Sequence, residues 1–127
     1  MKQFEINQTY CKVLLTISEL NKLNYYPLNE GIYKIVAGII DNEIMQFSDF
    51  ESYGTLSSFS SKKICRLTMM LFRRGLISKV LDPQTKKLYF RTTEKGEEAL
   101  KNYFAKHKKG FVRRKQKETI TIVKIAE

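Results

Sequence analysis

The segment from Ser60 to Gly75 constrains the fold more than any other part of the sequence. Ser60 and Ser61 are favourable helix N-cap residues, and glycine at position 75 is typical of a residue just past a helix C-terminus. The positions expected to be buried between these ends follow the i, i+3, i+4, i+7 spacing of one helix face: Ile64, Leu67, Thr68, Leu71 and Phe72. The sequence therefore predicts an amphipathic helix here.

The opposite face of this predicted helix carries five cations and no anion: Lys62, Lys63, Arg66, Arg73 and Arg74. An ordinary solvated face mixes charges of both signs, because an acid four residues from a lysine supports the helix. A basic surface helix without any ligand would show the same stripe. The missing acids favour an acidic partner on another molecule.

A β-hairpin is predicted directly after this helix. Residues 76–81 and 86–91 are rich in β-branched, aromatic and leucine residues, and they flank Asp82-Pro83-Gln84-Thr85, where Asp-Pro starts a type I turn. Thr93 can then cap a further helix, whose inward residues would be Ala99, Leu100, Tyr103 and Phe104. This order is that of a winged helix-turn-helix. We therefore expect an α+β fold, mainly α, in which the hairpin is the wing.

Two more helical segments precede the central helix. Residues 9–20 hold apolar positions at helical spacing, and we interpret them as an extra N-terminal helix for packing or dimerisation. Asn29 is expected to cap a second helix that runs through Ile40 with Gly38 inside it, and Ser48 to cap a short helical segment over 49–53.

The predicted domain organisation has three parts. Residues 1–26 are the N-terminal helix and linker, 27–107 the winged-helix domain, and 108–127 a basic C-terminal extension. The extension ends in a strand-like apolar run, 119–125, which needs a partner edge in this chain or another. Residues 4–6 are one candidate edge.

The charge is distributed unevenly along the chain. The net charge is +10; residues 1–60 hold four Lys/Arg against seven Asp/Glu, whereas residues 61–127 hold nineteen against six. Such asymmetry is typical of a protein that binds a polyanion. No apolar run approaches the roughly 20 residues of a membrane span, and the hairpin interrupts the cations that a membrane-surface helix would need. Without an apolar signal-peptide core, we expect a cytoplasmic location and no membrane partner.

Catalytic and metal-binding motifs are missing from the sequence. It contains no phosphate-binding loop of the G-x-x-x-x-G-K-[ST] type and no G-x-G-x-x-G. Cys11, Cys65 and His107 are too few for a four-ligand zinc site, and both cysteines are expected to be reduced. His107 lies among lysines without a partner that would make it a base. We therefore expect no enzyme, no cofactor and no metal.

Five short motifs between residues 27 and 105 stand in a defined order: Val36-Ala37-Gly38-Ile39-Ile40, Phe47-Ser48-Asp49-Phe50, Ser52-Tyr53-Gly54-Thr55-Leu56, Ser60-Ser61-Lys62-Lys63-Ile64 and Leu71-Phe72-Arg73-Arg74-Gly75-Leu76-Ile77. Together they resemble the RQC winged-helix domain, which follows the helicase core in RecQ-type DNA helicases. The resemblance implies binding to duplex and branched DNA. It places the contacts at the start of the central helix and in the wing: Ser58, Ser60, Ser61, Lys62, Lys63, Lys79, Lys86 and Lys87.

The sequence departs from that family in three respects. It has no helicase core, no four-cysteine zinc subdomain, and no aromatic residue at the wing tip, Pro83-Gln84-Thr85. A motor activity is therefore not implied. Strand separation by a base-stacking wedge is not implied either.

The residues themselves suggest how DNA would be held. The capped start of the central helix, with Lys62 and Lys63, can grip a phosphate. Further phosphate contacts are expected from Arg66, Arg73, Lys79, Lys86, Lys87 and Arg91. Arg66 is also best placed to reach a guanine edge in the major groove.

The predicted function is a non-enzymatic DNA-binding winged-helix protein of RQC-like type. Two alternatives remain open. One is a dimeric winged-helix transcriptional regulator, with the N-terminal helix or the C-terminal strand as the dimer contact. The other is a protein–protein adaptor that docks a larger nucleic-acid machine.

Overall fold

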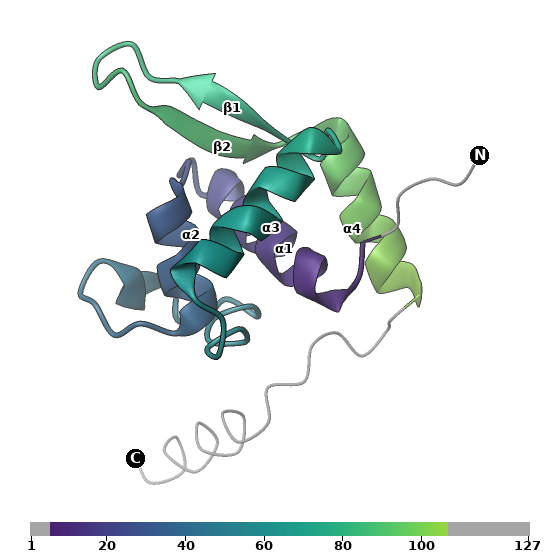
Figure 1. The fold of residues 1–127 in the computed structure, drawn as a ribbon, viewed down its shortest axis with the longest axis horizontal. Helices are drawn as coiled ribbons and strands as arrows, with labels where there is room; N and C mark the ends of the chain where they lie inside the picture. Colours follow the sequence, from purple (N-terminus) through teal and green to yellow (C-terminus); the bar gives the residue numbers. More distant parts are fainter. Residues whose placement is uncertain (1–5, 107–127) are drawn as a thin grey trace, which may run out of the picture.

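A computed structural model of the chain describes residues 6–106 and has a mixed α+β fold that is mainly helical. In chain order the elements are α1 (Gln8–Lys22), α2 (Asn29–Ala37), the 3-10 helix η1 (Ile44–Phe47), α3 (Ser61–Arg73), β1 (Ile77–Leu81), β2 (Leu88–Thr92) and α4 (Glu94–Lys106). The helices pack together, and the antiparallel β1–β2 hairpin projects beyond them (Figure 1). The basic extension, its strand-like run over 119–125 and the first two residues of the edge proposed at 4–6 lie outside the described residues.

Helix α1 forms the centre of the core. Cys11, Val13, Leu14, Ile17 and Leu20 are all 0% exposed, and the helix contacts α2, α3, α4 and β2. A helix that is covered on nearly every side belongs to the interior of its domain. Of the two roles expected for this helix, packing is therefore confirmed, because the apolar face of α1 is occupied within the chain.

Helix α2 ends earlier than its apolar spacing predicts. Gly38 has a left-handed φ of 75°, and a Cβ there would lie 3.0 Å from the Cα of Gly54. The close approach of this loop, together with the left-handed residue, ends the helix, so that Ile40 is 85% exposed rather than buried. Asn29 is the first helical residue and not the cap, since Leu28 occupies the N-cap position.

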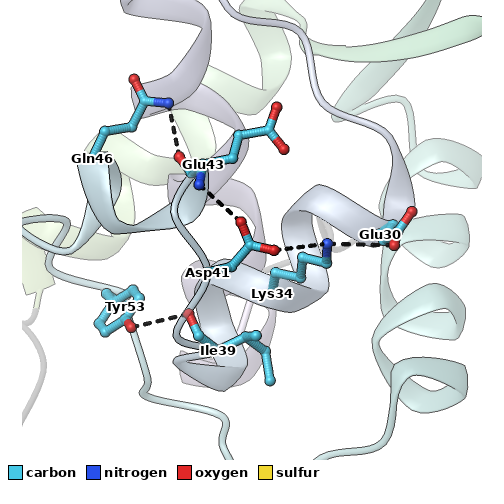
Figure 2. Close-up of polar contacts among 7 residues, drawn as sticks. All are labelled: Glu30, Lys34, Ile39, Asp41, Glu43, Gln46 and Tyr53. Atoms are coloured by element: carbon cyan, nitrogen blue, oxygen red, sulfur yellow. Dashed lines mark hydrogen bonds and ion pairs between the residues drawn. The ribbon is translucent and has the colours of Figure 1, made fainter.

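Polar contacts fix the turn that follows α2 (Figure 2). The Asp41 carboxylate accepts hydrogen bonds from the Glu43 backbone N–H at 2.8 Å and from the Lys34 ammonium at 3.4 Å. The first of these contacts, supported by the second, holds the pKa of Asp41 below its usual value. The Tyr53 hydroxyl donates to the Ile39 carbonyl at 3.2 Å and ties the turn to the loop before α3.

The expected short helix over 49–53 is absent. The regular structure in this region is η1, one turn earlier, and Ser48 lies at its C-terminal end. Turns follow until α3 begins. They bury Ile44, Phe47 and Tyr53 in a second small cluster with Leu20, so burial of these apolar side chains determines the local path.

The caps predicted for α3 and α4 are confirmed. The Ser60 hydroxyl accepts from the backbone N–H of Lys63 at 3.2 Å, and the Thr93 hydroxyl accepts from that of Gly96 at 3.1 Å. The Thr93 hydroxyl also donates to the carbonyl of Gly75 at 2.7 Å. The start of α4 is thus attached to the end of α3.

The predicted hairpin is confirmed, with a longer turn than expected. Its register pairs Ile77 with Thr92 at the base and Leu81 with Leu88 at the outer end. The backbone N–H of Lys86 donates to the Asp82 carbonyl at 2.7 Å, and Lys86 has a left-handed φ of 63°. Residues 86 and 87 therefore lie in the turn and not in the second strand.

Candidate nucleic-acid interface

The polar face of α3 is open to solvent along its whole length. Ile64, Thr68 and Leu71 are buried on the opposite side. The exposed side carries what we call the cationic face: Lys62, Lys63, Arg66, Arg73 and Arg74. No segment of the described chain covers these side chains. The one-sided distribution expected from the sequence is therefore present on this helix.

Most charges of the cationic face lack an acidic partner within residues 6–106. Among the described residues, no ion pair involves Lys62, Lys63, Arg66 or Arg73. Lys34, on α2, is held by carboxylates at 3.5 Å from Glu30 and 3.4 Å from Asp41. The difference matters because an uncompensated cluster creates a positive potential that attracts an external anion.

The N-terminal end of α3 adds donors to this face. Ser58 and Ser61 are exposed, while Ser60 is occupied by capping. The first backbone N–H groups of a helix have no partner within it, and they favour anions. Nearby, the Lys63 ammonium lies 4.6 Å from the centre of the Phe59 ring. This cation–π contact keeps the lysine beside the start of the helix.

A second cation–π contact joins the hairpin to the other end of α3. The Lys79 ammonium of β1 lies 4.6 Å from the centre of the Phe72 ring. The sequence places Phe72 on the buried helix face, but its side chain is 36% exposed and lies on the flank toward the hairpin. The cationic face therefore continues from α3 to Lys79, and Lys86 and Lys87 are exposed further out, in the turn.

Arg91 is not part of this arrangement. Successive side chains of a strand point to opposite faces, and Arg91 is paired with Ser78, one residue from Lys79. Arg91 therefore lies on the hairpin face opposite to Lys79. The structure brings together the other predicted basic residues of α3 and β1 and excludes this one.

The junction that sets the hairpin against α3 was missed by the sequence analysis. Gly96, in the first turn of α4, lies so close to Leu76 that a Cβ there would be 2.1 Å from its carbonyl oxygen. The backbone N–H of Thr93 donates to the same carbonyl at 3.1 Å. A glycine inside a predicted helix was the available signal, because it costs the helix about 1 kcal/mol unless packing requires it.

Acidic side chains gather elsewhere on the molecule. A groove of about 370 Å³ between α1 and α4 contains Glu19, Glu51 and Glu97 in its lining, and none of its lining residues belongs to α3. Glu97 accepts hydrogen bonds from Ser18 at 2.8 Å and from Thr92 at 2.5 Å. These three carboxylates thus lie away from α3, in a groove whose lining also contains Lys22 and Lys101.

Residues 6–106 contain no group of three or more His, Cys, Asp or Glu side chains arranged to hold a metal ion. Within the same residues, no helix combines the length and apolar character required to cross a bilayer.

No protein-family model matches this sequence, and a comparison with curated proteins finds no significant match.

Proposed function

We propose that the chain is a non-enzymatic DNA-binding protein with a winged helix-turn-helix fold of RQC-like type. In this proposal α2, residues 44–58 and α3 correspond to the helix-turn-helix, and the β1–β2 hairpin is the wing. The order of helices and hairpin supports this assignment. The ligand is the phosphate backbone of duplex or branched DNA.

The observation that carries the proposal is the row of α3 cations without an ion pair among the described residues, and its continuation to Lys79; these α3 cations are Lys62, Lys63, Arg66 and Arg73. Each lysine or arginine that neutralises a phosphate releases condensed counterions, which favours binding at moderate salt. A positive surface without acids of its own is suited to this role. The cation–π contacts with the rings of Phe59 and Phe72 restrict the motion of Lys63 and Lys79. This restriction lowers the conformational entropy that these two side chains lose when they contact DNA.

The dimensions of α3 suit a DNA groove. Its 13 residues form a rod about 20 Å long, and a major groove about 12 Å wide admits one α-helix. The exposed side chain of Arg66, near the middle of the rod, would then face base edges. Lys62 and Lys63 would lie near one phosphate chain, with the hairpin lysines against the backbone further along.

The test is a salt titration of binding to a duplex of about 30 base pairs. If Lys62, Lys63, Lys79, Lys86 and Lys87 each neutralise one phosphate, the slope of log K against log salt should be about −4.5. The double variant Lys62→Glu/Lys63→Glu should weaken binding at least tenfold and flatten the slope by about two units.

A charge-matched control is available in the groove between α1 and α4. Lys22→Glu/Lys101→Glu changes the net charge equally, but its residues lie away from α3. The proposal requires the control to lose much less affinity than the α3 variant. Equal losses would show that general cationic attraction, and not a defined face, accounts for the binding.

Comparison of DNA forms separates the RQC-like proposal from a regulator. Preference for forks or junctions over linear duplexes favours the former, and a footprint on one defined operator favours the latter. The burial of α1 makes this helix a less suitable dimer contact for the regulator hypothesis than an exposed element would be. A partner protein that remains bound after nuclease treatment would instead favour an adaptor.

A further inference from the structure

Two leucines are exposed side by side near the outer end of the hairpin. Leu81 is 57% exposed and Leu88 is 48% exposed. They face each other as the last pair of the β1–β2 ladder, just before the turn. Single exposed leucines are ordinary on protein surfaces, but a cross-strand pair forms one continuous apolar surface.

This apolar pair lies on the hairpin face that is directed toward α3. Strand alternation places Leu81 with Ile77 and Lys79, and Leu88 with Phe90. Ile77 and Phe90 are buried at the base of the hairpin, so the same face continues outward beyond the core as the leucine pair. The projecting part of the hairpin is visible in Figure 1.

Lysines lie on both sides of the leucine pair along the hairpin. Lys79 precedes it on the same face and rests on Phe72 of α3, while Lys86 and Lys87 follow in the turn. Such a patch, apolar in the middle and cationic at its edge, is continuous with the cationic face of α3. Lysines alone suffice to contact phosphates, and leucines gain nothing from phosphate oxygens. A partner that matches this patch therefore offers an apolar surface to the leucines and negatively charged groups to the lysines around them.

The stacked bases of duplex DNA provide that surface. Proteins that bend DNA insert apolar side chains between base steps through the minor groove, and nearby cations hold the flanking phosphates. Pyrimidine–purine steps such as TA unstack most easily, whereas A-tracts are stiff. The pair of Leu81 and Leu88 suits this insertion because leucine side chains are small enough to enter a partly opened base step.

We propose that Leu81 and Leu88 form a wedge that enters the minor groove at a flexible base step and bends the DNA, with Lys86 and Lys87 on the flanking phosphates. This inference rests on the proposed function. It goes further because it names a deformable duplex as the preferred substrate. Specificity would then arise partly from the ease of bending and not only from base contacts by α3.

The experiment measures bending by energy transfer between dyes on the two ends of a duplex of about 30 base pairs. One duplex carries a central TA step and the other an A-tract. The parent should shorten the end-to-end distance of the TA duplex and bind it more tightly. Leu81→Ser/Leu88→Ser should abolish both effects and weaken binding to the TA duplex on the order of tenfold, while the salt slope stays unchanged.

Two further variants serve as controls. Leu81→Met/Leu88→Met keeps an apolar surface and should still bend DNA. Leu23→Ser removes an exposed leucine that lies just after α1, and it should bind and bend as the parent does. Circular dichroism and urea unfolding of the serine variant verify that the hairpin remains folded.

The outcomes distinguish this inference from the proposed function. Salt-dependent binding of the parent without bending or step preference overturns the wedge and leaves DNA binding intact. Unchanged bending by the folded serine variant also overturns it. Absence of any salt-dependent binding overturns both proposals. If instead the serine pair loses affinity only for anionic phospholipid vesicles, the leucines belong to a lipid-binding surface and the wedge is wrong.

Discussion

Replacing Gly96 by alanine tests the junction between α3, the hairpin and α4. Alanine in a helix is favoured over glycine by up to about 1 kcal/mol, so helix propensity alone predicts a gain in stability. The structure predicts the opposite sign. The new Cβ would lie 2.1 Å from the carbonyl oxygen of Leu76 and 3.0 Å from its carbonyl carbon, and backbone atoms cannot rotate away.

To relieve this clash, α4 must move by about 1 Å, which is comparable with the overpacking that costs 1–3 kcal/mol in protein cores. The movement stretches two hydrogen bonds of Thr93, to the carbonyls of Leu76 at 3.1 Å and Gly75 at 2.7 Å, each worth about 1 kcal/mol. After subtraction of the propensity gain, we expect a net loss of about 2 kcal/mol. The melting temperature should fall by about 10 °C.

Gly31→Ala provides a matched control. Gly31 is the third residue of α2, as Gly96 is of α4, but a Cβ at Gly31 would meet only the Pro27 side chain at 3.8 Å. This variant should therefore gain about 0.5–1 kcal/mol. Urea unfolding followed by circular dichroism measures both changes. If Gly96→Ala is as stable as the parent while the control gains, the close approach of α4 to Leu76 is refuted.

Three further predictions concern single side chains. The backbone N–H of Glu43 holds the pKa of Asp41 below its usual 3.8, so this carboxylate stabilises the fold above pH 4 and the contribution is lost as the pH falls through the folded pKa. Asp41→Asn should therefore lose less stability than the parent in urea titrations between pH 4 and pH 2. Burial, and then a nearby carboxylate, raises the pKa of Cys11 to about 12, so at pH 8 a thiol reagent should label Cys65→Ser protein only after unfolding, and stability should decline above pH 9. Asn21 accepts from the Thr92 backbone N–H of β2 at 2.8 Å, and Asn21→Ala should cost about 1 kcal/mol in thermal unfolding because that partly buried donor loses its partner.

The elements predicted well from the sequence are those with local signals at both ends. Ser60 and Gly75 delimit α3, and Thr93 starts α4, because capping depends on residues only three positions apart. The hairpin was predictable for a similar reason, since the Asp-Pro turn and its flanking apolar runs are contiguous. The positive charge on one face of α3 was also predictable, because its lysines and arginines recur at helical spacing.

The errors concern features fixed by distant parts of the chain. Gly38 ends α2 where residue 54 approaches, and the helical spacing of Ile39 and Ile40 gave no sign of that contact. The central position of α1 depends on partners far along the chain. The face of Arg91 depends on the strand register, which the sequence did not specify.

The central position of α1 has a consequence for synthesis of the protein. Asn21, near the end of that helix, bonds to Thr92, 71 residues later in the chain. At translation rates of about 5–20 residues per second, roughly 4–14 s separate the two at the ribosome. During that interval the most buried helix of the nascent chain lacks its later partners, so the fold can be completed only after β2 and α4 have emerged.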